Sequence, residues 1–400
     1  MITVGEALDI IMAHKIDYGV EPVAIDQADG CILAEDIYCD RAMPPFHRVT
    51  MDGIAISYAA YQSGRRTFRK EKTVAAGEPQ RTLEDASSCI EIMTGAVCPI
   101  GADTIIRYED LEENEDGFTI LVDVKQKQNI HFKGSDHQQD EILLKAGKKL
   151  SPIDIGVLAT VGKAIVSVRK MPTALIVSSG DELVEVDVVP EAHQIRKSNV
   201  LVMEAILNDM GVRTRLLHLP DEPDEIYRKL KNELEEIDVL MMAGGVSKGK
   251  FDFIPQVLEE LGVEKKFHRV RQRPGKPFWF GIKEEKTVFA FPGNPVSSFA
   301  CFHRYFVPWI KMCLGQDPGN FIPVKLKSEV HFKPDLEYFA QAKLLVDSDG
   351  QLLGEVGHGN GSGDLVNPTK MNGFIILPRG KETFLAGEVY NFIPYKRIVY

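Results

Sequence analysis

Residues 171–315 alternate strand-length apolar runs with segments long enough to form helices. The apolar runs include residues 173–177, 239–242 and 286–291. Helices are expected at residues 198–210, 223–236, 253–261 and 297–314. This alternation predicts a mostly parallel sheet with helices on both faces, which is a three-layer α/β domain. Ligands of such sheets bind outside the carboxyl ends of the strands, so the loops at those ends are the first candidates for a site.

Four loops next to these runs, residues 178–183, 244–252, 273–277 and 292–298, carry complementary chemistry. Their glycines allow a ligand to approach the backbone, and Arg273 and Lys276 add positive charge. The turn at residues 292–298 precedes a helix whose first N–H groups can bind an anion, and Ser297 and Ser298 are candidate helix caps. Acidic residues in the same loops supply the hard oxygens that magnesium prefers. The loops therefore predict a phosphorylated substrate held through a divalent ion.

Charge and cysteine usage exclude several classes of protein. The net charge of −11 disfavours general binding of nucleic acid, which requires a basic face. The basic stretch at residues 265–273 is interpreted as a solvated edge strand, apart from Arg273. The six cysteines form no CxxC pair, so free buried thiols are expected rather than a zinc ribbon or disulfides. No secretory leader or membrane-spanning apolar run is visible, which predicts a cytoplasmic protein.

Outside the α/β region, the pattern changes to short strands and turns. We expect a discontinuous domain at residues 1–40 and 137–170, interrupted by a β-rich insertion at residues 41–136. The α/β domain is placed at residues 171–319, and a small β-barrel-like domain at residues 320–400. Hairpin turns are expected at residues 347–350 and 371–373. The glycine-rich stretch at residues 357–363 precedes no helix, so it is interpreted as a mobile hairpin loop rather than a phosphate cradle.

Several motifs also have simpler interpretations. Residues 245–249 match the G-x-S-x-G nucleophile elbow of hydrolases, but no suitably spaced histidine or oxyanion loop accompanies them. The loops at residues 44–53 and 94–103 would, taken alone, be ordinary turns. Asp224 can cap the helix that follows it, whereas Asp221 lies outside that helix and is less easily explained in this way.

Taken in order, the motifs resemble those of the molybdopterin molybdotransferases. The resemblance covers the whole chain and rests on six motifs, which are PxFxxxxMDGxA ending at Ala55, TGAxxPxGAD at 94–103, SSGDEL at 178–183, GGVSxGxxD at 244–252, RPGKP at 273–277 and PGNPVSS at 292–298. Residues 194–199 are also similar to the family's stretch before the first long helix of the α/β domain. The family inserts molybdate into adenylylated molybdopterin, with release of AMP.

The resemblance implies an L-shaped subunit of four parts and a homodimer, with each active site between one α/β domain and the partner's inserted domain. The implied catalytic residues are Asp52, Thr94, Glu182, Asp221 and Asp252. Of these, Glu182, Asp221 and Asp252 would bind the metal, which is Mg²⁺ with Zn²⁺ as the alternative. The implied substrate-binding residues are Ser179, Gly180, Asp181, Gly244, Gly245, Ser247, Arg273, Gly275, Lys276, Pro292, Gly293, Asn294, Pro295 and Ser297.

The chain departs from the family pattern at a few positions. Val49 and Thr50 replace the usual Ser-Ala before MDG, and Ile54 replaces the usual tyrosine after it. Lys250 stands where many members have an acid, and His131 where arginine is common. The Lys250 difference bears on the local charge balance and on the number of metal ions.

Three functions are compatible with these patterns. Molybdenum insertion is favoured. The related adenylyltransferase step would need only the α/β unit, and a scaffold that binds pterin without catalysis would not need the acidic set. Expected partners are a second copy of the chain and the small pterin substrate, with the adenylyltransferase of the same pathway as a candidate; nucleic acid and membranes are not expected partners. Molybdate-dependent release of AMP would distinguish the three functions.

Overall fold

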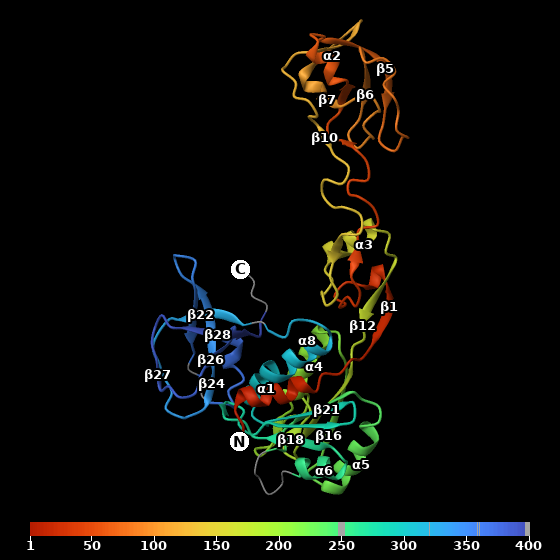
Figure 1. The fold of residues 1–400 in the computed structure, drawn as a ribbon. Coiled ribbons are helices and arrows are strands. Elements are labelled where there is room, and N and C mark those ends of the chain that lie inside the picture. Colours follow the sequence, from red (N-terminus) through yellow and green to blue (C-terminus); the bar gives the residue numbers. More distant parts are fainter. Residues whose placement is uncertain (247–252, 320, 358, 360, 397–400) are drawn as a thin grey trace.

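The computed structural model describes residues 1–246, 253–319, 321–357, 359 and 361–396. Figure 1 shows a body built from the α/β sheet, a β-rich unit beside it, and a long arm that ends in a further β-rich unit. The combination of α/β and β-rich regions predicted from the sequence is present, and its sheets are mixed rather than purely parallel.

The central sheet has six strands in the order β16-β13-β17-β21-β20-β18. In that order the strands are Arg213–Leu219, Thr173–Ser179, Val239–Ala243, Lys286–Phe291, Trp279–Lys283 and Glu264–His268. The first four are parallel, whereas β20 and β18 run antiparallel to their neighbours. The edge position of β18 agrees with the interpretation of its lysine-rich sequence as an edge strand.

Alternate residues of the central strands point to opposite faces, and both faces are covered by helices. On one face Ile176 and Met241 belong to a core shared with four helices, α1 Val4–Ala13, α4 Asn199–Asp209, α7 Pro295–Cys301 and α8 Val307–Cys313. On the other face Val177 and Met242 pack with α5 Pro223–Glu233 and α6 Ile254–Glu260. The two cores are consistent with the nearly continuous apolar sequences of the inner parallel strands β13, β17 and β21.

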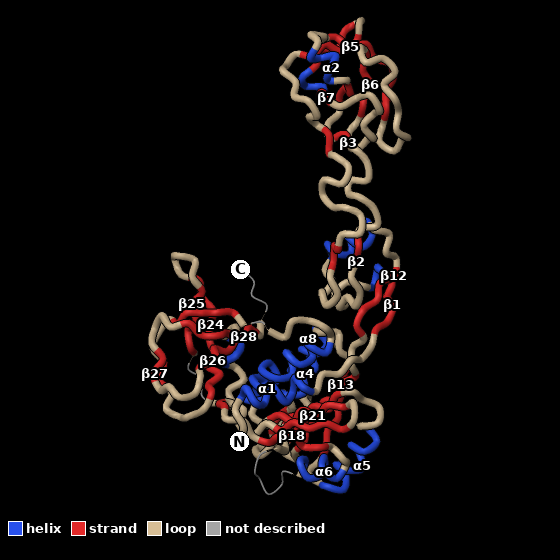
Figure 2. Tube along the Cα trace, viewed as in Figure 1, coloured by secondary structure: helices blue, strands red, loops and turns tan. Residues whose placement is uncertain are grey.

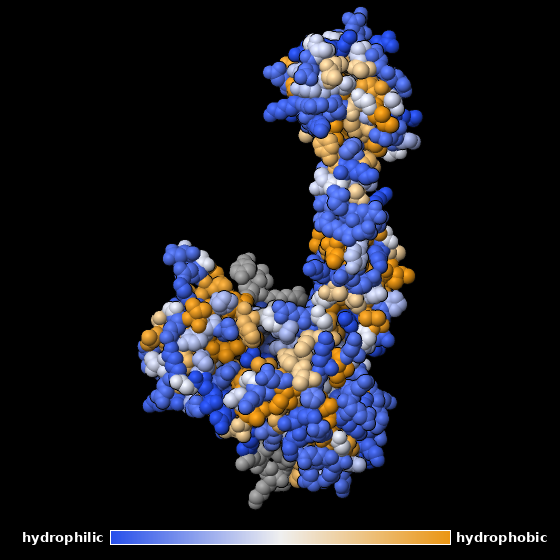
Figure 3. All heavy atoms as spheres, in the orientation of Figure 1, coloured by the Kyte–Doolittle hydropathy of each residue, from blue (hydrophilic) through white to orange (hydrophobic). Residues whose placement is uncertain are grey.

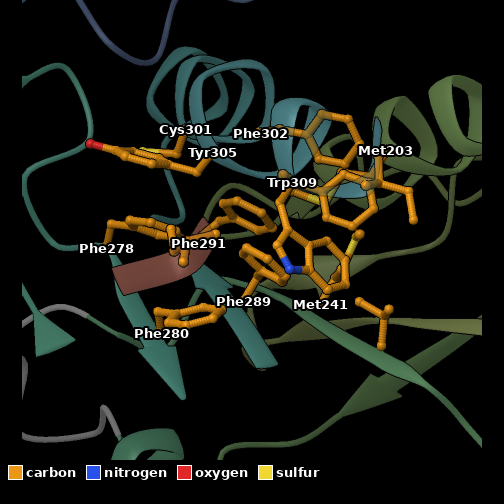
Figure 4. Close-up of a cluster of buried hydrophobic side chains, with 14 of the residues drawn as sticks. Met203, Met241, Phe278, Phe280, Phe289, Phe291, Cys301, Phe302, Tyr305 and Trp309 are labelled. Atoms are coloured by element: carbon orange, nitrogen blue, oxygen red, sulfur yellow. The ribbon is translucent and has the colours of Figure 1, made fainter. Parts of the chain in front are cut away.

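Aromatic side chains dominate the first of these cores. Phe278, Phe289 and Phe291 lie on the sheet side, and Tyr305 and Trp309 come from the helical segment that follows β21 (Figure 4). Phe278 stacks on Tyr305 with ring centroids 4.7 Å apart. The five residues Phe302–Phe306 between α7 and α8 form a π-helical turn (η3). This packing holds the helical segment rigidly against the edge of the sheet where the candidate loops lie.

The carboxyl-terminal region forms a closed barrel of five strands, because β24 pairs with both β25 and β26. The barrel strands are β22 Ile322–Leu326, β24 Glu337–Val346, β25 Leu352–Val356, β26 Gly373–Leu377 and β28 Val389–Pro394. The short strand β19 Gln272–Arg273 joins β24 and links the barrel to the α/β body. The remaining elements here are β23 Val330–His331, β27 Thr383–Phe384 and η4 Asn367–Lys370.

Two turns predicted for this region have different outcomes. Residues 347–350 connect β24 and β25, which pair antiparallel, so the predicted hairpin is confirmed. The hairpin predicted at residues 371–373 is wrong, because β26 follows η4 and pairs with β24 and β28 instead of the preceding strand β25. The Asn-Gly dipeptide therefore marks a strand start and not a two-residue hairpin.

The arm contains the strands on either side of the insertion. Its base holds β1 Val20–Ala24 paired with β12 Ile165–Arg169, β2 Ile37–Tyr38 paired with β11 Ile142–Leu144, α3 Pro152–Thr160 and the short turn η1 Ile25–Gln27. Figure 2 shows loops joining this base to the next pair, β3 Arg48–Val49 and β10 Ile130–His131. The far end of the arm is thus attached through two adjacent chain segments.

The end of the arm is a six-stranded sheet with a core on each face. In sheet order the strands are β7 Thr104–Arg107, β4 Gly53–Ile56, β6 Ser88–Ile92, β5 Thr67–Val74, β9 Gly117–Ile120 and β8 Leu111–Asn114, and the short helices α2 Tyr58–Gln62 and η2 Tyr108–Asp110 accompany them. Gly53 is required at the start of β4, because a Cβ there would lie 1.8 Å from the carbonyl oxygen of Ile106.

Among the described residues, no helix has both the length and the apolar character needed to cross a membrane. All six cysteines are described and all are free thiols, which confirms the prediction from the sequence. Five of them are buried, and Cys31 is partly exposed.

We expect a thiol reagent at pH 8 to modify Cys31 first and the other five cysteines only after denaturation. Burial blocks access to the five, and it raises the pKa of Cys98 and of Cys313 to about 11, so few thiolates form. Mass spectrometry of timed reactions measures the order of labelling. The Cys31→Ser variant is the control and should lose the fast phase; a second fast thiol in this variant would contradict the described burial.

Candidate functional site

Four loops meet at the edge of the central sheet that is formed by the carboxyl ends of its parallel strands. The parallel register aligns Ser178 of β13 with Ala243 of β17, and Ala243 with Phe291 of β21, so the loops that follow these strands emerge side by side. β20 runs the opposite way and pairs Trp279 with Ala290. The loop at residues 273–277 therefore enters the sheet at the same edge, next to the turn at residues 292–294.

Glycines allow these loops to pack closely. The N–H group of Gly244 donates to the carbonyl oxygen of Phe291 at 3.1 Å. Gly245 has a φ of +69°, and a Cβ on it would lie 2.2 Å from Cδ1 of Ile254 and 3.0 Å from Oγ of Ser179. Only glycine satisfies both the backbone conformation and the space at this position.

The first cavity at this edge is a cleft of about 590 Å³. It is lined by eight residues that the sequence predicted to bind substrate or metal, which are Ser179, Glu182, Gly244, Gly245, Pro292, Gly293, Asn294 and Pro295. It is also lined by residues 195–200, which lead into α4 and form its start, and which contribute Arg196, Lys197 and Asn199. Its size suits an organic ligand with several rings or a nucleotide.

A second cavity of about 410 Å³ lies between the α/β body and the barrel. Arg273, Gly275, Lys276 and Ser297 line this cavity and not the cleft, and Asn294 lines both. Barrel residues, including Tyr338 and Gln341, form its other wall. Among the described residues its lining contains two cations and no carboxylate, so its charge favours an anion. The single phosphate cradle predicted from the sequence is therefore divided between two adjoining cavities.

The described acidic residues of the predicted site lie in the loops that follow β13 and β16. Glu182 lines the cleft. The backbone N–H of Asp221 donates to Oδ1 of Asp181 at 3.3 Å, which brings the loops after β13 and β16 together. Asp252 and Ser247 lie outside the described residues, as does Lys250. In the part of the chain that is described, no three His, Cys, Asp or Glu residues are arranged to hold one metal ion.

The helix after β21 begins earlier than expected. α7 starts at Pro295 with Asn294 at the N-cap position, so Ser297 and Ser298 lie inside the helix and do not cap it. The N–H of Val296, one of the first N–H groups of the observed helix, donates to the carbonyl oxygen of Ser362 at 3.0 Å. The anion site predicted at this helix start is therefore partly occupied by the protein's own backbone.

The interpretation of residues 357–363 as a hairpin loop is wrong, because β25 before them and β26 after them do not pair with each other. Gly357, Gly359, Gly361 and Ser362 line the second cavity, and Gly363 lines the cleft. The side-chain amide of Asn294 donates to Oγ of Ser362 at 3.0 Å. Sequence reasoning missed this loop because it precedes no helix, and its position depends on how the barrel packs against the body.

Two further residues of the cleft were not among the predicted ones. The Asn199 side chain donates to the carbonyl oxygen of Gly293 at 2.6 Å and ties the start of α4 to the turn after β21. Lys197 forms an ion pair with Glu185, and its side chain is only 9% exposed. Burial, with the charge of Lys197, lowers the pKa of His218, which bonds to Ser178 behind the cleft at 3.0 Å. The motif at residues 194–199 was the sequence feature that could have indicated Asn199 and Lys197.

Asp52 and Thr94 form a pair of their own on the arm. The N–H of Thr94 donates to Oδ1 of Asp52 at 2.6 Å, and the hydrogen bonds from Thr94 lower the pKa of that carboxyl group. Both residues are exposed at the end of the arm, which Figure 1 shows far from the α/β edge. A single chain therefore does not bring them to the cleft.

Two of the positions at which the chain departs from the family pattern, Ile54 and His131, lie on the arm and pack or bond with their neighbours there. Ile54 is fully buried in β4, where it packs in the core of the arm sheet. His131 bonds Oδ1 of Asp136 at 2.8 Å and Arg48 at 3.2 Å, and the hydrogen bond lowers the pKa of Asp136. Both positions belong to the arm and not to the edge of the central sheet.

Comparison with known proteins gives matches along the whole chain. The family model described as "MoeA N-terminal region (domain I and II)" matches residues 2–162, and the one described as "Probable molybdopterin binding domain" matches residues 175–312. A Synechocystis protein named molybdopterin molybdenumtransferase is 37% identical over 98% of this chain and 99% of its own length. A Staphylococcus epidermidis protein of the same name is 30% identical over 98% of this chain and 95% of its own.

A solved structure agrees with these matches. The molybdopterin biosynthesis moea protein from Pyrococcus horikosii superimposes with a TM-score of 0.85 at 27% identity, and the similarity covers 99% of both chains. The arm, the α/β body and the barrel are thus all included in the likeness.

Proposed function

The chain belongs to the molybdopterin molybdenumtransferase family, and from that premise we propose that it inserts molybdenum from molybdate into adenylylated molybdopterin and releases AMP. The observation that carries the proposal is the 37% identity to a named molybdopterin molybdenumtransferase from end to end. An adenylyltransferase or a scaffold built on the α/β unit alone would not require similarity through residues 2–162.

The two cavities suggest how the substrates are divided. The cleft holds the large organic part of the substrate, because its volume of about 590 Å³ and its glycine-lined walls admit a ring system and a nucleotide. The second cavity holds an oxyanion, either molybdate or a phosphate group, beside Arg273 and Lys276. Asn294 lines both cavities, which supports adjacent positions for the two proposed ligands.

The chemistry of the acidic residues, though not an arrangement seen among the described ones, suits a divalent cation of the Mg²⁺ type. Asp181, Glu182 and Asp221 offer only carboxylate oxygens, which suit Mg²⁺ better than Zn²⁺, a metal that prefers nitrogen and sulfur. Glu182, Asp221 and Asp252 would hold the ion, and when bound it would neutralise the negative charge of the pyrophosphate. The protein's own task is to hold the pterin nucleotide and the oxyanion in contact and to exclude water.

We also propose a homodimer in which the arm of one subunit reaches the cleft of the other. The placement of Asp52 and Thr94 at the end of the arm motivates this proposal. Apolar side chains at the base of the arm are exposed, including Val20 at 50%, Ile153 at 76% and Ile165 at 62%, and Figure 3 shows hydrophobic spheres there. Exposed apolar residues of this kind favour burial against a second copy. A cytoplasmic location and the lack of nucleic-acid and membrane partners stay predictions from the sequence.

Replacing Lys276 by alanine is expected to weaken binding of the anionic substrate by ~1.5–3 kcal/mol, the range for hydrogen bonds to charged groups. The loss should be larger at low salt, because screening reduces the wild-type advantage at high salt. Calorimetry at two ionic strengths measures it. Lys283→Ala is a matched control, because Lys283 is at the other end of β20 and lines neither cavity. Equal affinities for the Lys276 variant and the wild type at low salt would remove Lys276 from the site.

The proposed function is tested with purified chain, adenylyl-molybdopterin and Mg²⁺. We expect AMP to appear when molybdate is added and not in its absence. AMP release that does not depend on molybdate, or none at all, would contradict the proposal.

A further inference from the structure

A buried polar network lies directly beneath the loop at residues 273–277. Gln272, the residue before this loop, is fully buried. Its Nε2 group donates to the carbonyl oxygen of Gly275 at 2.9 Å and contacts Sγ of Cys301 at 3.1 Å. The hydroxyl group of Tyr305 donates to Oε1 of Gln272. The network therefore connects the helical segment after β21 to the middle of the loop.

The donors and acceptors of this network fix which side of the Gln272 amide carries its oxygen and which carries its nitrogen. An amide can flip and exchange its oxygen and nitrogen, but the carbonyl oxygen of Gly275 can only accept, so it requires Nε2 on its side. With Nε2 donating to Gly275, Oε1 faces Tyr305 and accepts from its hydroxyl group. Figure 4 shows the hydroxyl oxygen of Tyr305 at the outer edge of the aromatic cluster, while its ring is stacked on Phe278 within the cluster. A rigid core thus sets the position of one backbone carbonyl in the loop.

Gly275 packs so closely against this network that no larger residue fits there. Its φ is +89°, and a Cβ on it would lie 2.4 Å from Sγ of Cys301 and 2.9 Å from Nε2 of Gln272. Arg273 and Lys276, the two cations that line the second cavity, flank Gly275 in the sequence. Fixing the Gly275 carbonyl therefore fixes the backbone from which both cations project.

We propose that Tyr305 and Gln272 are positioning residues that hold the loop of Arg273 and Lys276 in its anion-binding conformation. Neither is proposed as a catalytic residue. Tyr305 is fully buried and lines neither cavity, whereas Gln272, also fully buried, lies in the wall of the second cavity and acts by holding the loop. The alternative is that the network only supplies hydrogen bonds to buried polar groups and thereby stabilises the fold. The positioning role and the purely stabilising role predict different effects of removing the Tyr305 hydroxyl group. Only the positioning role predicts a change in the loop and in anion binding.

The experiment compares Tyr305→Phe with Tyr395→Phe in the full-length protein. Both changes remove one tyrosine hydroxyl that hydrogen-bonds within the protein, and both rings belong to the same aromatic core. Tyr395 donates to the carbonyl oxygen of Pro368 and lines neither cavity. Hydrogen exchange of residues 269–277 reports on the loop without any ligand. Binding of inorganic molybdate reports on the cations, and this second readout rests on the oxyanion site proposed above.

We expect Tyr305→Phe to speed exchange in residues 269–277 and to weaken molybdate binding about tenfold, while Tyr395→Phe changes neither. Gln272→Met is a second variant that removes both bonds of the amide and should give the same pattern. Because Tyr305 acts through Gln272, the double variant should bind no more weakly than Gln272→Met alone.

Three results would overturn the inference. These are unchanged exchange in Tyr305→Phe, an equal effect of Tyr395→Phe, or fully additive losses in the double variant. If the wild type binds no molybdate, the second cavity is not a molybdate site, and the exchange measurement alone decides whether the network positions the loop.

Discussion

Replacing Glu182 by alanine is expected to lower Mg²⁺-dependent release of AMP by roughly 100-fold or more. A preorganised charge that acts on the transition state contributes ~3 kcal/mol, which corresponds to such a factor. Glu182 lines the cleft from an exposed loop, so its removal should leave the fold and the melting temperature unchanged. The rate is measured over a range of Mg²⁺ concentrations, because loss of a metal ligand should also raise the concentration required.

Two further variants sharpen this test. Glu182→Gln keeps the shape of the side chain and removes its charge, and should be nearly as inactive as the alanine variant. Glu191→Ala removes an exposed carboxylate from the same segment, one that lines neither cavity, and should retain activity. Normal turnover in Glu182→Ala would exclude the proposed role of this residue.

Mixing two inactive variants, Asp52→Ala and Glu182→Ala, is expected to restore activity. If each site combines the arm of one subunit with the cleft of the other, a mixed dimer has one site with both substitutions and one site with neither. Random exchange makes half of the dimers mixed, so recovery of roughly a quarter of wild-type activity follows from the two-fold symmetry. Differently tagged subunits and native mass spectrometry demonstrate the exchange.

The control is a mixture of Asp52→Ala with a tagged copy of the same variant, which should stay inactive. Failure of the mixed variants to recover despite demonstrated exchange would contradict a shared site. It would mean that Asp52 acts elsewhere or that the arm reaches its own cleft in another conformation.

Local sequence patterns predict where a helix begins when a single capping motif determines its first residue. Thr3 and Glu6 form a capping box at the start of α1, which a threonine followed by a glutamate three residues later indicates from the sequence. The start of α7 was misplaced by two residues because Pro295, with its fixed φ and no N–H, is suited to the first helical turn, so the helix begins there and not at Ser297. The domain boundaries drawn from the sequence stay predictions.

The division of the site into two cavities could not be predicted from local patterns. It depends on the short pairing of β19 with β24, which brings the barrel against the loop at residues 273–277. The same packing brings Ser362 to Asn294, which are far apart in the sequence. The placement of Asp52 on the arm likewise follows from tertiary structure, because the motif around Met51-Asp52-Gly53 shows only a turn locally.

The central claim is that this chain couples release of AMP to the insertion of molybdenum. The most direct measurement follows a single reaction of purified chain, adenylyl-molybdopterin, Mg²⁺ and molybdate, and quantifies AMP and pterin-bound molybdenum together. We expect the two products to appear at the same rate and in equal amounts, and both to be absent without molybdate. AMP released without molybdenum bound to the pterin would contradict the claim.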